Sequence, residues 1–190
     1  MTLLALLLLA LATLAPALVV PARRVVDDPV VPVAAATALL LGLAAAVAAR
    51  VDPASGWRAA AAAVLGVALA TTGGGLVVRS VFRLMRREFL PARTNRRSSD
   101  PETPGARPAP ATEPGAVLRG GAWIGYLERL AVAATLVAGW PEGIALVLAV
   151  KGVGRYAELR QPDAPEAFII GTLTSLLWAA AAAGTAHLLR

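Results

Sequence analysis

Five ionisable residues lie inside or beside apolar stretches of the C-terminal half: Glu128, Arg129, Lys151, Arg155 and Glu158. A charge near the centre of a bilayer costs several kcal/mol, so such a residue normally faces a bundle interior, a water cavity or a partner. The cluster therefore predicts one of two things. It is a polar site for an ion, a proton or an anionic head group, or it is an ion-pair network that fixes helix register, with its inner members reaching to the interface. The network is preferred, because the cytoplasmic half of a bilayer relieves much of the cost.

The spacing of these residues predicts that they meet. Glu128 lies before, and Lys151 after, a turn expected at Trp140. At about 1.5 Å per residue, the two side chains start roughly 18 and 15 Å from that turn. Lys151, Arg155 and Glu158 follow i, i+4, i+7 spacing and share one helix stripe. We therefore expect one connected intramembrane polar network.

The groups that most catalysis and metal binding require are missing. The sequence has no Cys and a single His, His187, which excludes a disulfide, a thiolate nucleophile, a Cys-ligated metal and a His-rich metal site. No catalytic carboxylate set or metal motif is present. We predict no enzyme activity, no metal and no cofactor.

The elements that carry these residues are apolar runs of membrane-span character. Of the 190 residues, 57% are apolar and only 16% are charged, and the mean hydropathy is +0.67. This balance is far from that of an ordinary soluble domain. Several runs approach the roughly 20 residues that a bilayer span needs. The sequence predicts an all-α membrane bundle of about six transmembrane helices, with apolar runs at residues 2–20, 30–49, 59–78, 130–140, 143–150 and 167–189.

The distribution of basic residues predicts the orientation. If residues 21–29 lie inside, 14 of the 18 Lys and Arg residues fall in inner segments, three fall outside, and Arg129 lies within a span. Basic residues in short loops resist translocation. Both termini are therefore expected outside. The first apolar run lacks a basic segment before it, which favours a retained first span over a cleaved signal peptide.

The chain changes character at residues 88–118, where six Pro alternate with Arg, Ser, Thr and acidic residues. This composition is typical of a flexible linker. It divides the chain into an N-terminal three-span module at residues 1–87, a Pro/Arg-rich cytoplasmic linker at 88–118 and a C-terminal three-span module at 119–190.

A basic stripe precedes this linker, with approximate i, i+4, i+7, i+8 spacing: Arg79, Arg83, Arg86 and Arg87. It predicts contact with anionic lipids at the membrane surface. The simpler alternative, which we prefer, is charge that only sets topology. Nucleic acid is not expected as a partner, because nothing identifies a reading fold.

Small residues mark two places of close helix approach. Gly171 and Ser175 stand four apart in the last apolar run, a spacing that lets helices pack closely. Gly73, Gly74 and Gly75 form either a hinge or a second packing surface, and packing is preferred.

The C-terminal module, residues 119–190, resembles the C-terminal membrane module of an uncharacterised bacterial membrane-protein family, a domain of unknown function. The resemblance rests on three ordered blocks, Ile124-Gly125-x-Leu127-Glu128-Arg129, Lys151-x-x-x-Arg155-Tyr156-x-Glu158-Leu159 and Glu166-x-x-Ile169-Ile170-Gly171-Thr172-Leu173-x-Ser175. It implies a shared charged membrane module and a multi-pass protein of the bacterial cytoplasmic (inner) membrane, with no activity to carry over.

These features predict a non-enzymatic scaffold or accessory subunit. Membrane lipids are the expected partners, together with a protein partner met through the cytoplasmic linker or the helix bundle, and the pattern allows an oligomer. The alternative is a small transporter or channel that uses the charged C-terminal module as a proton or anion site. A water-accessible cavity at the charged cluster would favour transport or ligand binding, whereas a dry, paired cluster would favour the scaffold.

Overall fold

The fold is a bundle of helices. A computed structural model describes residues 1–18, 29–97, 121–160 and 164–190, with the backbone alone described at residues 18, 87–97, 158 and 164. All regular elements in these ranges are helical: α1 (Thr2–Leu14), η1 (Ala15–Leu18), α3 (Val30–Ala48), α4 (Trp57–Arg97), α5 (Gly121–Val137), α6 (Gly143–Gly154), η2 (Glu158–Arg160) and α7 (Ala164–Leu188). The predicted all-α fold class is confirmed for this part of the chain.

Breaks between helices coincide with Pro and Gly. Pro29 occupies the N-cap of α3, where its missing N–H costs least. Gly56 and Gly139 adopt positive φ angles of 60° and 74° just before α4 and after α5, a conformation that glycine reaches without steric cost. Short turns of this kind make neighbouring helices antiparallel.

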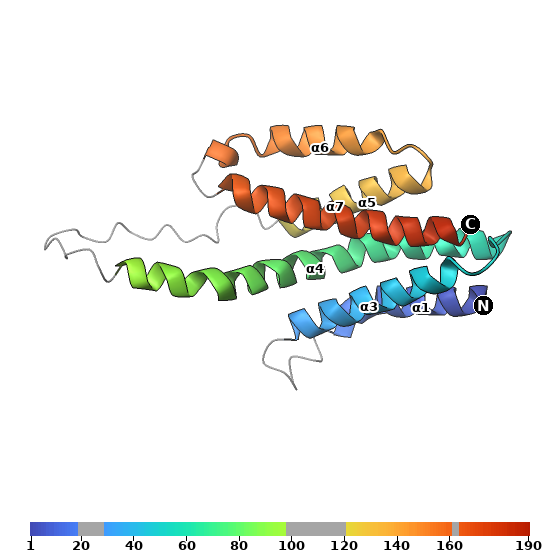
Figure 1. Cartoon of the computed structure of the whole chain (residues 1–190). Coiled ribbons are helices and arrows are strands. Elements are labelled where there is room, and N and C mark those ends of the chain that lie inside the picture. The colour runs from blue at the N-terminus through green and yellow to red at the C-terminus, as the bar shows by residue number, and fades with distance from the viewer. Residues whose placement is uncertain (19–28, 98–120, 161–163) are drawn as a thin grey trace, which may run out of the picture.

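Helix α4 is the central element of the bundle. Figure 1 shows α1 and α3 along one side of it and α5 and α7 along the other, with α6 outermost and both termini at the same end. The most extensive contacts of α4 are with α7, and α6 packs mainly on α5. The two predicted modules therefore share one interface along α4.

The apolar core also crosses the predicted module boundary. One buried cluster contains Leu9 of α1, Leu41 of α3, Leu69 of α4, Val132 of α5 and Trp178 of α7. Ala fills most of the remaining buried positions, and its small side chain lets helix axes approach closely.

Within the described ranges, three helices are long and apolar enough to cross a membrane: Val30–Ala48, Trp57–Arg86 and Pro165–Leu188. Their composition indicates a membrane protein. Helix α6 and the segment Thr2–Ala17 are apolar but shorter, and α6, with 12 residues, is only about 18 Å long. The six-span count stays a prediction.

Helix α4 continues into the segment predicted as linker. It runs for 41 residues and ends at Arg97, so the first ten residues of the predicted linker, 88–97, are helical. Most residues around this boundary, which include Leu, Met, Glu and Arg, have high helix propensity, and the helix extends through them. The rest of that segment, residues 98–118, lies outside the described part of the chain.

Candidate functional site

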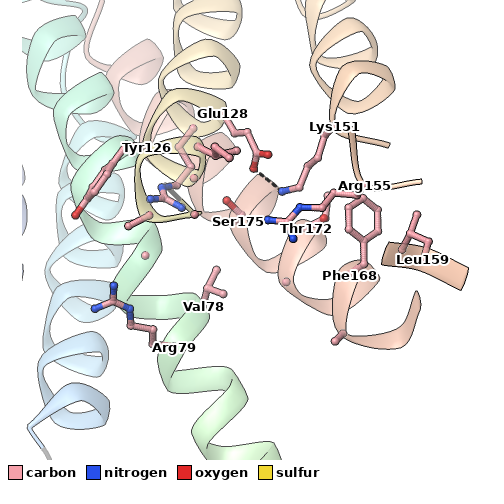
Figure 2. A pocket seen from close by; sticks show the side chains of 18 residues that line it. Val78, Arg79, Tyr126, Glu128, Lys151, Arg155, Leu159, Phe168, Thr172 and Ser175 are labelled. Atoms are coloured by element: carbon pink, nitrogen blue, oxygen red, sulfur yellow. Dashed lines mark hydrogen bonds and ion pairs between the residues drawn. The ribbon is translucent and has the colours of Figure 1, made fainter. Parts of the chain in front are cut away.

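The charged cluster contains an ion pair between α5 and α6. The Lys151 ammonium donates to Oε2 of Glu128 at 2.5 Å, and both side chains are less than one-fifth exposed. Figure 2 shows the two side chains directed toward each other from neighbouring helices. The depth count from the Trp140 turn indicated this pairing. Since α6 packs mainly on α5, the ion pair is a polar anchor for the outermost helix.

Arg129 follows Glu128 in sequence but points to a different neighbour. Its Nε donates to the backbone oxygen of Thr71 on α4 at 3.0 Å. Its guanidinium lies over the ring of Tyr126, 5.3 Å from the ring centroid. The residue is only 6% exposed. Within the described part of the chain, no carboxylate pairs with it.

The glycine run of α4 makes room for this arginine. A Cβ built at Gly74 would overlap Cδ of Arg129, and one built at Gly73 would overlap the ring of Trp178. Helix α4 is continuous through these residues. The Gly73–Gly75 run is therefore a packing surface, as preferred from the sequence, and the helix has no break there.

The same glycines expose backbone oxygens of α4. In a helix, the side chain at i+4 leans back toward the carbonyl of residue i. Gly73 and Gly75 stand four residues after Leu69 and Thr71, so no side chain covers those two carbonyls. The Trp178 indole N–H donates to the Leu69 oxygen at 3.1 Å, and Nε of Arg129 donates to the Thr71 oxygen. Two long polar side chains are thereby fixed against the centre of α4.

A cavity of about 550 Å³ opens beside these contacts. It lies between α4, α5, α6 and α7, and its charged lining residues are Arg79, Glu128, Arg129, Lys151 and Arg155. Four positive charges and one negative charge give the lining a net charge of +3. Among the described residues, no group of three His, Asp or Glu could hold a metal ion. The charge of this lining suits an anion.

The terminal nitrogens of Arg129 lie at the wall of this cavity. A Cβ at Gly125 would be 3.3 Å from Nη1, and one at Gly75 would be 3.4 Å from Nη2. Both glycines line the cavity. In the described structure, the hydrogen bond of Arg129 is made through Nε, and neither Nη atom has a protein acceptor. These donors are placed to bind a group inside the cavity.

Thr172 adds a second donor without a partner. The residue is 8% exposed, and its Oγ1 is buried with no hydrogen-bond partner among the described residues. Its side chain lies on the same cavity, on the α7 wall beside Ser175, and the Arg155 side chain reaches toward both (Figure 2). A buried hydroxyl without a partner costs about 1–3 kcal/mol. The Thr172 hydroxyl is therefore a donor at the cavity wall that the described residues leave without an acceptor.

A second, smaller space of about 10 Å³ lies next to the ion pair. Its apolar walls are Val132, Val147, Leu148 and Leu176. The polar residues around this small space also line the large cavity, so the two spaces are neighbours. Arg79 lines the larger cavity and does not border the small space, so the larger cavity extends toward the part of α4 that carries Arg79.

The remaining predicted network residues are Arg155 and Glu158. Arg155 follows the last turn of α6, is half-buried and lines the cavity. Glu158 begins η2, and its side chain is outside the described part. The structure thus brings Glu128, Arg129, Lys151 and Arg155 around one cavity. It orients Arg129 toward α4 instead of toward the ion pair.

The predicted packing and lipid-contact residues border the same region. Gly171 approaches the ring of Phe82, to which an added Cβ would come within 3.3 Å. Ser175 is buried on the next turn of α7, and both residues line the cavity. Of the basic stripe, Arg79 is exposed at the mouth of the cavity, Arg83 is half-buried and Arg86 is exposed. The side chain of Arg87 is not described.

Sequence reasoning missed Thr172, Tyr126 and Phe168 as cavity residues. The centroid of the Phe168 ring lies 5.9 Å from the Lys151 ammonium, and both residues line the cavity. A signal existed for Thr172, because it lies one turn from Phe168 and one from Ser175 on the helix that faces the charges. Trp178 lies within the last apolar run, and nothing in the sequence indicated that it would donate to a backbone oxygen.

Comparisons with known proteins return nothing: no family model, no curated protein and no solved structure matches this chain.

Proposed function

We propose that this chain is a multi-pass membrane protein that binds an oxyanion in the cavity between α4, α5, α6 and α7. The ligand would be a phosphate-like group held by Arg129, with Lys151 and Arg155 beside it and Arg79 at the mouth. The proposal is non-enzymatic, since the lining supplies donors and positive charge but no nucleophile with its base.

The buried guanidinium of Arg129, which has no ion-pair partner among the described residues, is the observation that carries the proposal. A charge taken out of water is costly unless it is paired and hydrogen-bonded. One backbone oxygen and one aromatic face offset only part of that cost for Arg129. An oxyanion in the cavity would supply the missing counter-charge through the two Nη atoms, and guanidinium groups bind phosphate in this bidentate way.

We further propose that the cavity faces the cytoplasm. Six crossings with both termini outside would put the Arg79 end of α4 inside, next to the arginines that follow it. Trp57 and Arg79 are separated by about 33 Å along α4, close to the thickness of a bilayer core. The bacterial cytoplasmic membrane is the location that the sequence resemblance implies.

The predicted scaffold role and the alternative transport role depend on different residues of this region. The Glu128–Lys151 pair supports a structural role, because it links α6 to the bundle. Transport would require a path past Val132, Val147 and Leu176, the apolar residues around the small space of about 10 Å³. We therefore propose binding from one side, and the cavity makes ligand binding a better account than a scaffold alone.

Thermal unfolding in detergent tests the proposal. Unfolding is followed by tryptophan fluorescence in chloride and in inorganic phosphate at matched ionic strength and pH. A ligand that binds only the folded state stabilises it by RT ln(1 + [L]/Kd), or about 2.7 kcal/mol at 100 times Kd. We expect a saturable rise of the midpoint in phosphate, which Arg129→Gln abolishes.

Two exposed arginines of α4 provide a matched pair of variants that should both fold. Arg79 lies at the cavity mouth, whereas Arg58 lies at the opposite end of the helix. Arg79→Gln should weaken the phosphate effect severalfold, and Arg58→Gln should leave it unchanged. A midpoint that responds to ionic strength but not to phosphate would refute the site, as would equal effects of the two variants.

Cysteine labelling tests the proposed orientation independently. The chain contains no Cys, so a single introduced thiol has no background. Ser55→Cys, in the turn before α4, should react with a membrane-impermeant maleimide added to intact cells. Gly121→Cys, exposed at the cavity end, should react only after permeabilisation. The reverse pattern would place the cavity outside and contradict the cytoplasmic assignment.

A further inference from the structure

We infer that the ligand of this cavity is a phosphate-bearing amphiphile of the membrane, with its head group in the cavity and its chain leaving over α5. This inference rests on the proposed anion site and names the class of ligand. It follows from three features: the apolar walls, the aromatic residues at the mouth and the exposed apolar surface that continues from the cavity.

The cavity combines a charged interior with apolar walls. Val78, Ile124, Leu159 and Phe168 line it together with the basic residues. A site for a small inorganic anion gains nothing from aliphatic side chains, because its selectivity comes from donors and charge. Apolar walls beside a cationic interior match a ligand that has both characters.

Exposed aromatic residues lie at the open end of the cavity. Trp123 stands near the start of α5, in edge-to-face contact with Tyr126, and Tyr156 follows the end of α6. Both Trp123 and Tyr156 are more than half exposed. Amphipathic rings of this kind prefer the head-group level of a membrane. The mouth therefore lies where phospholipid phosphates are found.

The buried donors lie a short distance below this level. Arg129 is six residues from Trp123 along α5, or about 9 Å. Thr172 is six residues from Glu166, near the start of α7, and is therefore at a similar depth. A head group that moves inward by this distance meets the Nη atoms of Arg129 and the hydroxyl of Thr172.

A path for an apolar chain continues outside the mouth. Ile124 lines the cavity and is 40% exposed, and Leu127 on the adjacent α5 surface is 62% exposed. Arg129, Ile124 and Leu127 thus share one helix, α5. An alkyl chain that lies over Ile124 and Leu127 would reach the hydrocarbon region of the membrane while its head group stays in the cavity.

A series of n-alkyl phosphates tests the inference in detergent: inorganic phosphate, butyl phosphate and hexyl phosphate, with hexanol as the uncharged control. Dissociation constants come from the ligand dependence of the unfolding midpoint. Each buried methylene contributes about fourfold in affinity, so we expect roughly fifteenfold tighter binding of hexyl than of butyl phosphate, which has two methylenes fewer. Hexanol should have no saturable effect.

A pair of wall variants on α5 localises the chain. Ile124 and Leu130 are 40% and 41% exposed, and Ile124 alone of the two lines the cavity. Ile124→Ser should flatten the dependence on chain length while preserving the affinity for inorganic phosphate. Leu130→Ser should leave both unchanged.

The outcomes separate the inference from the proposed function. Equal affinity for phosphate and for both alkyl phosphates would overturn the amphiphile and retain the anion site. Binding that strengthens with chain length but is equal in both wall variants would also overturn it, since the chain would lie elsewhere. If no phosphate compound binds, both the inference and the anion site fail.

Discussion

Replacing Thr172 by Val should stabilise the ligand-free protein and weaken its response to phosphate. Val has nearly the shape of Thr and lacks the hydroxyl, so the change removes the buried polar atom that has no described partner. Leaving such a hydroxyl unsatisfied costs about 1–3 kcal/mol. We expect a gain of about 1 kcal/mol, or about 2–4 °C in midpoint for a chain of this size.

The same substitution at Thr185 is the matched control. Thr185 is also buried on α7, at 3% exposure, but its Oγ1 donates to the oxygen of Ala181 at 2.8 Å. Thr185→Val removes a satisfied hydroxyl far from the cavity. We expect a loss of about 0.5–1.5 kcal/mol, with the phosphate response intact.

The assay is a pair of melts for each variant, in chloride and in saturating phosphate. The unfolding midpoint of Thr172→Val should be higher than that of wild type in chloride. Phosphate should raise this midpoint by less than in wild type, since one ligand donor is gone. If Thr172→Val instead loses stability as Thr185→Val does, and responds to phosphate like wild type, its hydroxyl is satisfied without a ligand. That result would refute the reasoning about Thr172 while leaving Arg129 to be judged separately.

Two further predictions concern packing and charge. Glu128→Gln should lower the free energy of unfolding by about 2 kcal/mol, because it leaves the mostly buried Lys151 without its counter-charge. Adding Lys151→Met should recover part of this loss in a double-mutant cycle of unfolding free energies. Additive losses would show that the pair is not coupled. Gly74→Ala should cost about 1–3 kcal/mol through overlap with Arg129 and should abolish the phosphate response, whereas Gly42→Ala, whose added Cβ meets nothing within 4 Å, should not destabilise in the same melts.

The helices and the ion pair could be reached from the sequence for physical reasons. Runs of apolar residues bounded by Pro and Gly fix where helices begin and end, because both residues act locally. The depth of Glu128 and Lys151 follows from the rise per residue and the one tight turn between them. These inferences need no knowledge of how the helices rotate about their axes.

The cavity could not be reached because it depends on that rotation. Which helix Arg129 faces is decided by the packing of α4 against α5 and α7, and the sequence carries only a local hint, the run Gly73–Gly75. A glycine run predicts close approach but not the side chain that approaches. The donors on Thr172 and Arg129 meet only after four helices are placed.

The contrast between Glu128 and Arg129 separates a structural charge from a binding charge. Adjacent helix residues point about 100° apart, so the two side chains enter different surroundings. Glu128 faces α6 and is neutralised by Lys151. Arg129 faces α4 and the cavity, where the described structure gives it one hydrogen-bond acceptor and no ion pair. If Arg129 served only to fix helix register, a carboxylate at this place would stabilise it further. An arginine held by its Nε, with both Nη atoms at a cationic cavity, is pre-organised for an anion that comes from outside the chain.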